Sequence, residues 1–308
     1  MSEKLYVLGH PVGHSKSPAM YNAVYEKAGL HWHYGLMDLP TVDEAEAFLA
    51  ARDFLSINIT TPYKPEALAA ADVQAASARL AHGANVLVNK EGALIAYNTD
   101  GQGCVAYLER AGIAFKGKSV VVCGTGPTSL SILHAVAQAG PAEVVLVGRD
   151  KARAQTVMRA YADELGALIG KVVDMPAMKE GHLSFAELYK QVAFKFGSYD
   201  TSKQAIAAAD IIIDATPLGM REGDPAPFDT ALLSAGQTVF DVVYGHGETA
   251  LAHAARAAGC TFLDGAGMLV GQAVVTVGIL RDITGEASLD MSEDELFALM
   301  ANAAGFTL

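Results

Sequence analysis

Two short segments of the chain carry side chains that could transfer protons. Lys64 ends a segment of small polar residues that follows an apolar run, and Asp100 lies in an Asn-Thr-Asp-Gly turn that opens a helical pattern. A strand end that presents a lysine and a helix start that presents a carboxylate can meet in one site as a pair for general acid–base catalysis. The alternative is a surface turn with an aspartate that caps a helix.

The elements that must position this pair alternate along the chain. Short β-branched runs and alanine-rich helical patterns follow one another almost throughout, which predicts an α/β fold with parallel sheets. We expect a domain hinge near residues 100–114 and a return crossing near residues 265–272. Residues 172–204 have a mixed pattern that fits either a strand and helix or a flap. The expected strands are 4–8, 32–36, 55–59, 119–123, 143–147, 211–214, 239–243 and 261–263, and the expected helices begin near residue 18 or cover 42–51, 73–80 and 100–112.

The composition excludes several classes of protein. A length of 308 residues suggests about two domains, and a net charge of −12 argues against non-specific nucleic-acid binding. Cys104, Cys123 and Cys260 are widely spaced, which fits a reducing cytoplasm better than a disulfide framework or a metal site. The chain lacks a leader pattern and an apolar run of about 18 residues, so we expect neither secretion nor a membrane span.

A glycine-containing turn directly follows the apolar strand expected at residues 119–123. It reads Gly-Thr-Gly-Pro-Thr-Ser over residues 124–129 and opens a helix. In a dinucleotide loop the first glycine permits a tight turn, the second lets the backbone approach a pyrophosphate, and the helix N-terminus supplies N–H donors. An ordinary strand-to-helix turn is the alternative. The candidate cofactor residues in this turn are Gly124, Thr125, Gly126, Pro127 and Thr128.

The end of the next expected strand indicates which dinucleotide the protein prefers. At this place an acidic residue would bind the ribose 2′-hydroxyl of NAD, whereas an arginine would bind the 2′-phosphate of NADP. The chain presents Arg149 and Arg153, which can form bidentate contacts with phosphate. Asp150 keeps NAD possible as the cofactor. The alternative to a cofactor-binding segment is a cluster of solvated charges after a strand. NADP is therefore the expected cofactor.

With these motifs in order, the chain resembles the shikimate dehydrogenase family over nearly its whole length. Several motifs in the family's order make the resemblance specific. The matching segments are Ser15-Lys16-Ser17-Pro18, the Asn-x-Thr-x-Pro-Tyr-Lys motif at 58–64, Asn98-Thr99-Asp100-Gly101, Asp214-Ala215-Thr216-Pro217-Leu218-Gly219-Met220, Asp241-Val242-Val243-Tyr244 and the Asp-Gly-Ala-Gly-Met-Leu-Val-Gly-Gln-Ala motif at 264–273.

The resemblance implies a fold and a set of site residues. It implies an N-terminal α/β substrate domain over 1–100, completed by C-terminal helices from about 270–308, and a Rossmann-type doubly wound parallel sheet over 101–269, with the cleft between them. Lys64 would be catalytic, with Asp100 as its partner. Tyr244 could equally be an aromatic residue that only packs at the end of its strand. Met220 and Met268 could equally be ordinary residues of the hydrophobic core. The implied substrate-binding residues are Ser15, Ser17, Asn58, Thr60, Asn85, Tyr244 and Gln272, and further implied cofactor contacts are Thr216, Met220, Gly267 and Met268.

The chain departs from the family pattern in several places. Where the family has Gly-Ala-Val-Asn-Thr, this chain reads Gly-Ala-Asn-Val-Leu over residues 83–87. The asparagine therefore comes one position early, and Val86 takes its place. Two placements of Asn85 stay open: a one-residue slip in a strand would move its side chain to the opposite face, away from the substrate, whereas a local bulge would restore the register and bring it into the pocket. Pro127 in the glycine loop, Asp150 after Arg149 and the length of residues 172–204 also depart from the family pattern.

Two classes of function remain open. The first is an NADP-dependent, cytoplasmic dehydrogenase that interconverts 3-dehydroshikimate and shikimate, or acts on quinate or an amino analogue. The cofactor would carry the hydride, and Lys64 with Asp100 would move the proton as a coupled unit. The second is a non-catalytic nucleotide or metabolite sensor. Retention of both residues favours the enzyme. We expect a small cyclic hydroxy-carboxylate as the partner, a monomer or homodimer, and no metal, nucleic acid or membrane.

Overall fold

The computed structural model describes residues 3–172 and 191–308, which form two compact units. Unit 1 contains Met1–Cys104 and Leu269–Leu308, and unit 2 contains Val105–Met268. Most of the stretch at 172–204 lies outside the described residues. Its last part forms the strand β9 (Ala193–Ser198) and the start of the helix α9 (Lys203–Ala208).

Unit 1 is built on a six-stranded sheet whose strands follow the order β2-β1-β3-β5-β6-β4. β1 pairs in parallel with both β2 and β3, so the ends of β1 and β3 open at the same edge. The strands are β1 (Lys4–Gly9), β2 (His33–Asp38), β3 (Ser56–Ile59), β4 (Val73–Gln74), β5 (Val86–Lys90) and β6 (Ala93–Tyr97); the helices are α1 (Ser17–Lys27), α2 (Val42–Ala51), α3 (Lys64–Ala70), α4 (Ala76–Ala81) and α12 (Glu293–Ala304), with parts of α5 (Asp100–Arg110) and α11 (Ala266–Thr284) and the short helix η2 (Ala287–Leu289).

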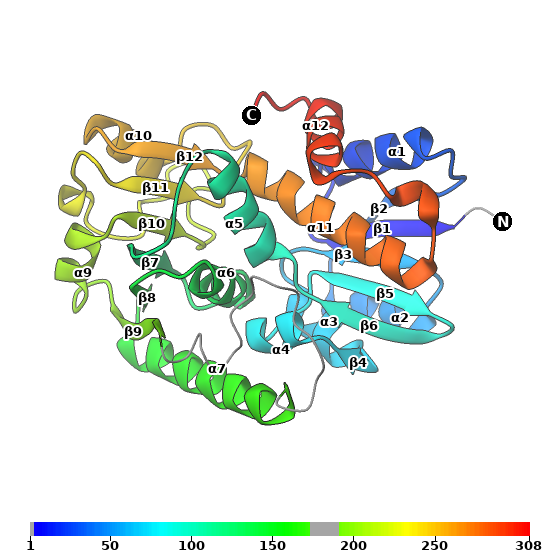
Figure 1. Ribbon diagram of the computed structural model, residues 1–308, viewed down its shortest axis with the longest axis horizontal. Helices are drawn as coiled ribbons and strands as arrows, with labels where there is room; N and C mark the ends of the chain where they lie inside the picture. The colour runs from blue at the N-terminus through cyan, green and yellow to red at the C-terminus, as the bar shows by residue number, and fades with distance from the viewer. Residues whose placement is uncertain (1–2, 173–190) are drawn as a thin grey trace. The chain divides into compact units, whose positions relative to one another are not determined.

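The alternation of side chains along β3 divides the core of unit 1 into two faces. Ile57 and Ile59 pack with residues of α2, α3 and α4 in one aliphatic cluster. Ser56 and Asn58 are also buried but belong to the other face, because neighbouring residues of a strand point to opposite sides. On that face α1 packs against β2 and α12 (Figure 1). The buried polar side chain of Asn58 is therefore separated from the aliphatic core by the sheet itself.

Two local expectations for unit 1 are wrong. The sheet is not wholly parallel, because β5 runs antiparallel to both β3 and β6. Glu91 and Gly92 both have positive φ between β5 and β6, which is the two-residue turn of a tight hairpin. A glutamate in place of the usual asparagine hides that signal in the sequence. The helix expected over 73–80 begins only at Ala76, since Val73 and Gln74 pair with β6 as a short edge strand.

Unit 2 is a parallel six-stranded sheet with the strand order β12-β11-β10-β7-β8-β9. The order reverses at β7, so the loops after β7 and β10 lie next to each other, and such a switch point is where doubly wound sheets bind ligands. The strands are β7 (Ser119–Cys123), β8 (Glu143–Gly148), β9, β10 (Ile211–Asp214), β11 (Thr238–Asp241) and β12 (Thr261–Asp264), and the helices are α6 (Pro127–Gln138), α7 (Lys151–Val172), α9, α10 (Ala250–Ala257) and the short helix η1 (Thr230–Leu232).

The sheet of unit 2 is covered on its two faces by helices. α6 and α7 contact β7, β8 and β9, and α9 and α10 contribute to a cluster with the buried valines and isoleucines of the central strands (Figure 1). Among the described helices, α11 alone is long and apolar enough to cross a membrane by length and composition, and most of that stretch is buried in the protein. Burial of this kind is typical of a core helix.

Candidate active site

The lysine expected to transfer protons begins α3. The preceding turn is fixed by backbone hydrogen bonds from Thr60 N to Leu8 O (2.9 Å) and from Tyr63 N to Thr60 O (3.1 Å). Tyr63 is buried and its hydroxyl donates to Leu39 O at 2.5 Å, which anchors the turn on the end of β2. Lys64 is therefore held at a rigid strand-to-helix junction, at the edge of the sheet where β1 and β3 end.

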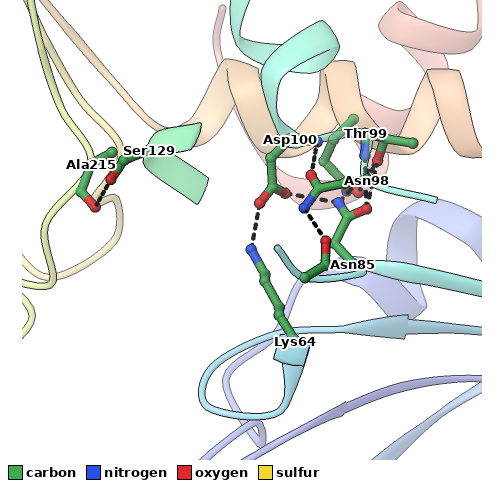
Figure 2. A network of polar contacts seen from close by, with 9 residues as sticks. Lys64, Asn85, Asn98, Thr99, Asp100, Ser129 and Ala215 are labelled. Carbon is green, nitrogen blue, oxygen red and sulfur yellow. Dashed lines mark hydrogen bonds and ion pairs between the residues drawn. The ribbon is translucent and has the colours of Figure 1, made fainter. Parts of the chain in front are cut away.

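Lys64 and Asp100 form an ion pair within unit 1. Lys64 Nζ donates to Asp100 Oδ2, and the side chains are only 14% and 8% exposed (Figure 2). Asp100 is the first residue of α5, and its own N–H donates to Asn98 Oδ1 (3.1 Å). Asn98 Nδ2 in turn donates to Gly83 O (2.8 Å). A buried, hydrogen-bonded pair of this kind can accept a proton from a bound alcohol or donate one to the oxygen of a bound ketone as it is reduced.

Asn85 also belongs to this network, although it comes one position earlier than the asparagine of the family pattern. Its Nδ2 donates to Asp100 Oδ1 (2.8 Å) and to Thr99 Oγ1 (2.9 Å), and its Oδ1 accepts from Thr99 N (2.8 Å) (Figure 2). Asn85 lies just before β5, where its N–H donates to Tyr97 O and its carbonyl accepts from Ile59 N. Val86 is the first residue of β5 and is fully buried. The residue before the strand, not the first strand position, thus faces Asp100.

Gln272 reaches the same network because two glycines let α5 and α11 approach closely. A Cβ on Gly103 would lie 2.3 Å from Gln272 N, and a Cβ on Gly271 would lie 2.5 Å from Gly103 O. Thr99 Oγ1 lies 3.4 Å from Gln272 Oε1, and Gln272 Nε2 donates to Leu269 O (2.8 Å). The glycines in the two motifs therefore set the distance between the helices that carry Asp100 and Gln272.

The serine loop lies at the ends of β1 and β2. Ser17 N donates to Ser15 Oγ (3.2 Å), and Ser17 is buried at the start of α1. Thr60 packs against Gly9, since a Cβ on Gly9 would lie 2.3 Å from Thr60 Cγ2. The structure thus places Ser15, Ser17, Asn58 and Thr60 after or within neighbouring strands of one sheet.

An exposed pair of side chains, His10 and Asp38, stabilises this loop. His10 Nδ1 and Asp38 Oδ1 lie 2.7 Å apart, and Asp38 Oδ2 accepts from Val12 N (3.2 Å). These hydrogen bonds hold the pKa of the Asp38 carboxyl below its usual value, with the His10 contact as the largest cause. The exposed end of β2 is therefore linked to the segment that leads into Ser15.

The glycine turn of unit 2 has the geometry of a dinucleotide loop. Gly124 has a φ of +112°, and a Cβ there would lie 2.4 Å from Ser129 Oγ and 3.1 Å from Ala215 O. Ser129 Oγ in turn donates to Ala215 O (3.4 Å), which joins the loops after β7 and β10 (Figure 2). A Cβ on Gly126 would meet no atom within 4 Å, so its backbone is accessible. Pro127 then begins α6, where a missing N–H costs nothing. The half-buried Thr125 and Thr128 complete the turn.

The residues after β8 divide into two roles. Arg149 and Arg153 are exposed and can reach a ligand anion. Asp150 Oδ1 instead accepts from Ala152 N (2.8 Å), and its carbonyl accepts from Ala154 N, so this aspartate caps the start of α7. One oxygen of the carboxylate that kept NAD possible in the sequence is therefore bound to the start of the helix that follows it.

Aspartates end three neighbouring strands of unit 2, and each shapes the loop that follows. Asp214, Asp241 and Asp264 align in register, and their Oδ1 atoms accept from the N–H of Thr216, Val243 and Ala266 respectively. Asp214 is buried, and its Oδ2 has no hydrogen-bond partner among the described residues. Burial and the Asp241 charge raise the pKa of Asp214 to about 8, and burial raises that of Asp241 to about 6.

The remaining expected cofactor and substrate residues of unit 2 lie on the loops after these strands. Thr216 is half-buried and its Oγ1 accepts from Leu218 N, whereas Met220 is exposed. Burial raises the pKa of the Tyr244 phenol. Gly267 lies against the ring of Tyr107, which a Cβ would strike, and Met268 beside it is buried. Over residues 3–172 and 191–308 no cluster of His, Cys, Asp and Glu could hold a metal ion.

Comparisons with known proteins agree with this geometry. Residues 7–87 match the shikimate dehydrogenase substrate binding domain. The shikimate dehydrogenase (NADP(+)) of Symbiobacterium thermophilum is 34% identical over 272 residues, which cover 87% of this chain and 85% of that protein.

Two solved structures share the whole fold. A shikimate dehydrogenase in complex with NADP+ has a TM-score of 0.76 at 25% identity and covers 100% of this chain and 96% of its own. A quinate dehydrogenase from Corynebacterium glutamicum in complex with NAD has a TM-score of 0.75 at 28% identity and covers 98% of this chain and 99% of its own. The chain therefore belongs to the shikimate dehydrogenase family.

Proposed function

We propose that the protein is an NADP-dependent oxidoreductase that interconverts 3-dehydroshikimate and shikimate. The observation that carries the proposal is the buried network in which Lys64 and Asn85 each donate to one oxygen of Asp100. A sensor that only binds a metabolite has no need of a lysine–carboxylate pair, so the network favours catalysis over binding alone. The relatives named as NADP-dependent shikimate dehydrogenases support the choice of substrate and cofactor.

The residues of unit 2 fit an NADP molecule. The backbone at Gly126 and the N-terminus of α6 suit a pyrophosphate, while Arg149 and Arg153 suit the 2′-phosphate. Asp150 caps α7, and the two arginines beside it supply the positive charge that a phosphate needs. When bound, NADP supplies or accepts the hydride.

The chain's own residues then have to bind the ring and move one proton. In the oxidation of the alcohol, the Lys64–Asp100 pair accepts the hydroxyl proton, and in the reduction of the ketone it returns a proton to the oxygen. The two groups act as one coupled unit. Asn85 keeps the Asp100 carboxylate in a single orientation. Ser15 and Ser17 would bind the substrate carboxylate, and Asn58, Thr60 and Gln272 would bind its hydroxyl groups.

A matrix of kcat/KM values tests the proposal. Shikimate and quinate would each be assayed with NADP and NAD, and we expect the highest value for shikimate with NADP. A higher value for quinate would move the protein to the quinate branch of the family, to which the Corynebacterium glutamicum structure belongs. Binding of NADPH without turnover of either substrate would identify a sensor and refute the proposed activity.

A further inference from the structure

A buried tyrosine in unit 1 lies behind two of the proposed substrate-binding residues. Tyr34 Oη donates to Asn58 Oδ1 at 2.8 Å, and both side chains are buried. The Tyr34 ring stacks on Tyr21 with 4.4 Å between centroids and 9° between planes. Asn22 holds the Tyr34 backbone at both polar groups: Tyr34 N donates to Asn22 Oδ1 (2.9 Å), and Asn22 Nδ2 donates to Tyr34 O (3.0 Å). The position of the Tyr34 hydroxyl is therefore fixed.

The amide of Asn58 is only half satisfied. Its oxygen is taken by Tyr34, whereas its buried Nδ2 has no partner with hydrogen-bond geometry among the described residues, although the Tyr21 side chain lies beside the amide. Leaving a buried donor unpaired is unfavourable, so an N–H in this state is a ready site for an acceptor. Because Tyr34 occupies the oxygen, the amide cannot turn over without breaking that bond.

The same hydroxyl contacts the serine loop. Burial raises the pKa of Tyr34 well above its usual value, the neighbouring Tyr21 and Tyr25 act in the same direction, and a polar contact with Ser17 opposes them. The phenol therefore keeps its proton and remains a donor. Tyr34 thus contacts Ser17 on α1 and Asn58 on β3, two residues far apart in sequence that lie at the edge where β1 and β3 end.

We propose that Tyr34 is a positioning residue for substrate binding, which holds Asn58 so that its Nδ2 donates to an oxygen of the bound hydroxy-carboxylate and keeps Ser17 in register with it. This role rests on the proposed function, because it needs a substrate rich in oxygen acceptors. Tyr34 itself would not touch the substrate. It acts by fixing which end of the Asn58 amide faces the ligand.

The test compares Tyr34→Phe with Tyr25→Phe. Tyr34→Phe keeps the stacked ring and removes the donor to Asn58, whereas Tyr25 is equally buried but its hydroxyl has no partner among the described residues. We expect Tyr34→Phe to raise the Kd of shikimate measured by calorimetry, and its KM, about 3–10-fold, as for one hydrogen bond. The KM for NADP should not change, and Tyr25→Phe should leave both substrate constants at the wild-type value.

A double-mutant cycle separates positioning from general stability. In an Asn58→Ala background, Tyr34→Phe should have almost no further effect on shikimate affinity, because the residue it positions is gone. Asn58→Asp, which keeps an oxygen toward Tyr34 but replaces the Nδ2 donor by an acceptor, should weaken binding at least as much as Asn58→Ala.

The outcomes distinguish this role from the proposed function. Equal affinities for Tyr34→Phe and Tyr25→Phe, or additive effects of the two substitutions in the cycle, would overturn the positioning role while the activity stands. If Tyr34→Phe fails to fold, Asn58→Asp with wild-type affinity would overturn it as well. A wild-type protein that neither binds nor converts shikimate or quinate would refute the proposed function and this role together.

Discussion

Asn85 donates to one carboxylate oxygen of Asp100 while Lys64 donates to the other. Both oxygens of the carboxylate are thereby oriented by side chains from the ends of two different strands. The amide of Asn85 thus reaches Asp100 although the motif differs from the family pattern by one position. Because both side chains donate to Asp100, we expect a substitution at either Asn85 or Lys64 to act through Asp100.

Replacement of Lys64 by alanine should remove most of the activity. General acid–base groups contribute about 10²–10⁴-fold, so we expect kcat to fall at least about 100-fold with a much smaller change in KM. Asp100→Asn should also be severe, and the double variant should cost less free energy than the sum of the single ones. Lys90→Ala, at an exposed position, is the control. Steady-state kinetics would contradict the mechanism if Lys64→Ala kept wild-type turnover.

The register around β5 gives a second prediction. Asn85→Ala removes a hydrogen bond to a charged group, so kcat/KM for shikimate should fall about 10-fold or more. Val86→Asn should not improve activity, because it buries an amide in the core and should lower the melting temperature instead. Asn89→Ala, in the same strand, controls for stability alone. A gain in kcat/KM from Val86→Asn would show that the strand shifts by one residue when substrate binds.

Cofactor preference should depend on Arg149. Arg149→Ala should raise KM for NADP about 10-fold or more and leave KM for NAD nearly unchanged, since a charge-assisted phosphate contact is lost. Arg159→Ala, exposed on α7, should change neither constant. Asp150→Ala should cost about 1 kcal/mol of stability through the lost helix cap. If it instead abolished the use of NAD, then Asp150 would be a ribose ligand.

The close approach of α5 and α11 can be tested with a matched pair of glycines on α11. Gly271→Ala places a Cβ 2.5 Å from Gly103 O, so we expect a loss of about 1–3 kcal/mol in unfolding free energy and a higher KM for shikimate through Gln272. Gly278→Ala meets no atom within 4 Å and should stabilise the helix by up to about 1 kcal/mol. Denaturant unfolding measures both variants. Equal stabilities would mean that the helices separate without cost.

The buried Asp214 predicts a pH dependence of stability. Its pKa is about 8 in the folded protein but near 4 for an unfolded aspartate, so folding takes up a proton between these values. The stability is fully present below about pH 4 and is lost as pH rises through about 8. Asp214→Asn cannot ionise and keeps the oxygen that accepts from Thr216 N. The variant should therefore melt at a higher temperature than wild type at pH 8, with a smaller difference at pH 5.

Several groups that lie near Asp214 interact with its charge and are therefore part of the same titration. Asp241 lies beside it on β11, and Cys123 and Tyr199 sense its charge, since it contributes to the raised pKa of each. Asp264→Asn changes the exposed aspartate at the same position of β12 and controls for loss of a strand-end carboxylate. The melting temperatures of wild type and Asp214→Asn would be measured from pH 5 to 9. If they differ by the same amount at every pH, a protonated Asp214 is refuted.

The sequence by itself determined eight of the twelve described strands, the glycine turn after β7, the two arginines after β8 and the segments that carry Lys64 and Asp100, but it missed β4, β5, β6 and β9. These features depend on side-chain periodicity, glycine conformations and helix starts, which are encoded within a few neighbouring residues. The roles of the individual residues in binding stay predictions until the variants are measured. The antiparallel hairpin escaped notice because Glu91 is an unusual residue for its turn.

Only the tertiary structure decided which side chains meet. Asn85 and Asp100 are 15 residues apart, Tyr34 and Asn58 are 24 apart, and Thr99 and Gln272 are 173 apart. Whether such residues touch depends on the order and register of the strands in the sheet and on how closely α5 and α11 approach each other, and both are set by packing across the whole of unit 1. Asn85 shows the difference: its sequence position suggests displacement from the site, but because it lies just before the first paired residue of β5, its side chain faces Asp100.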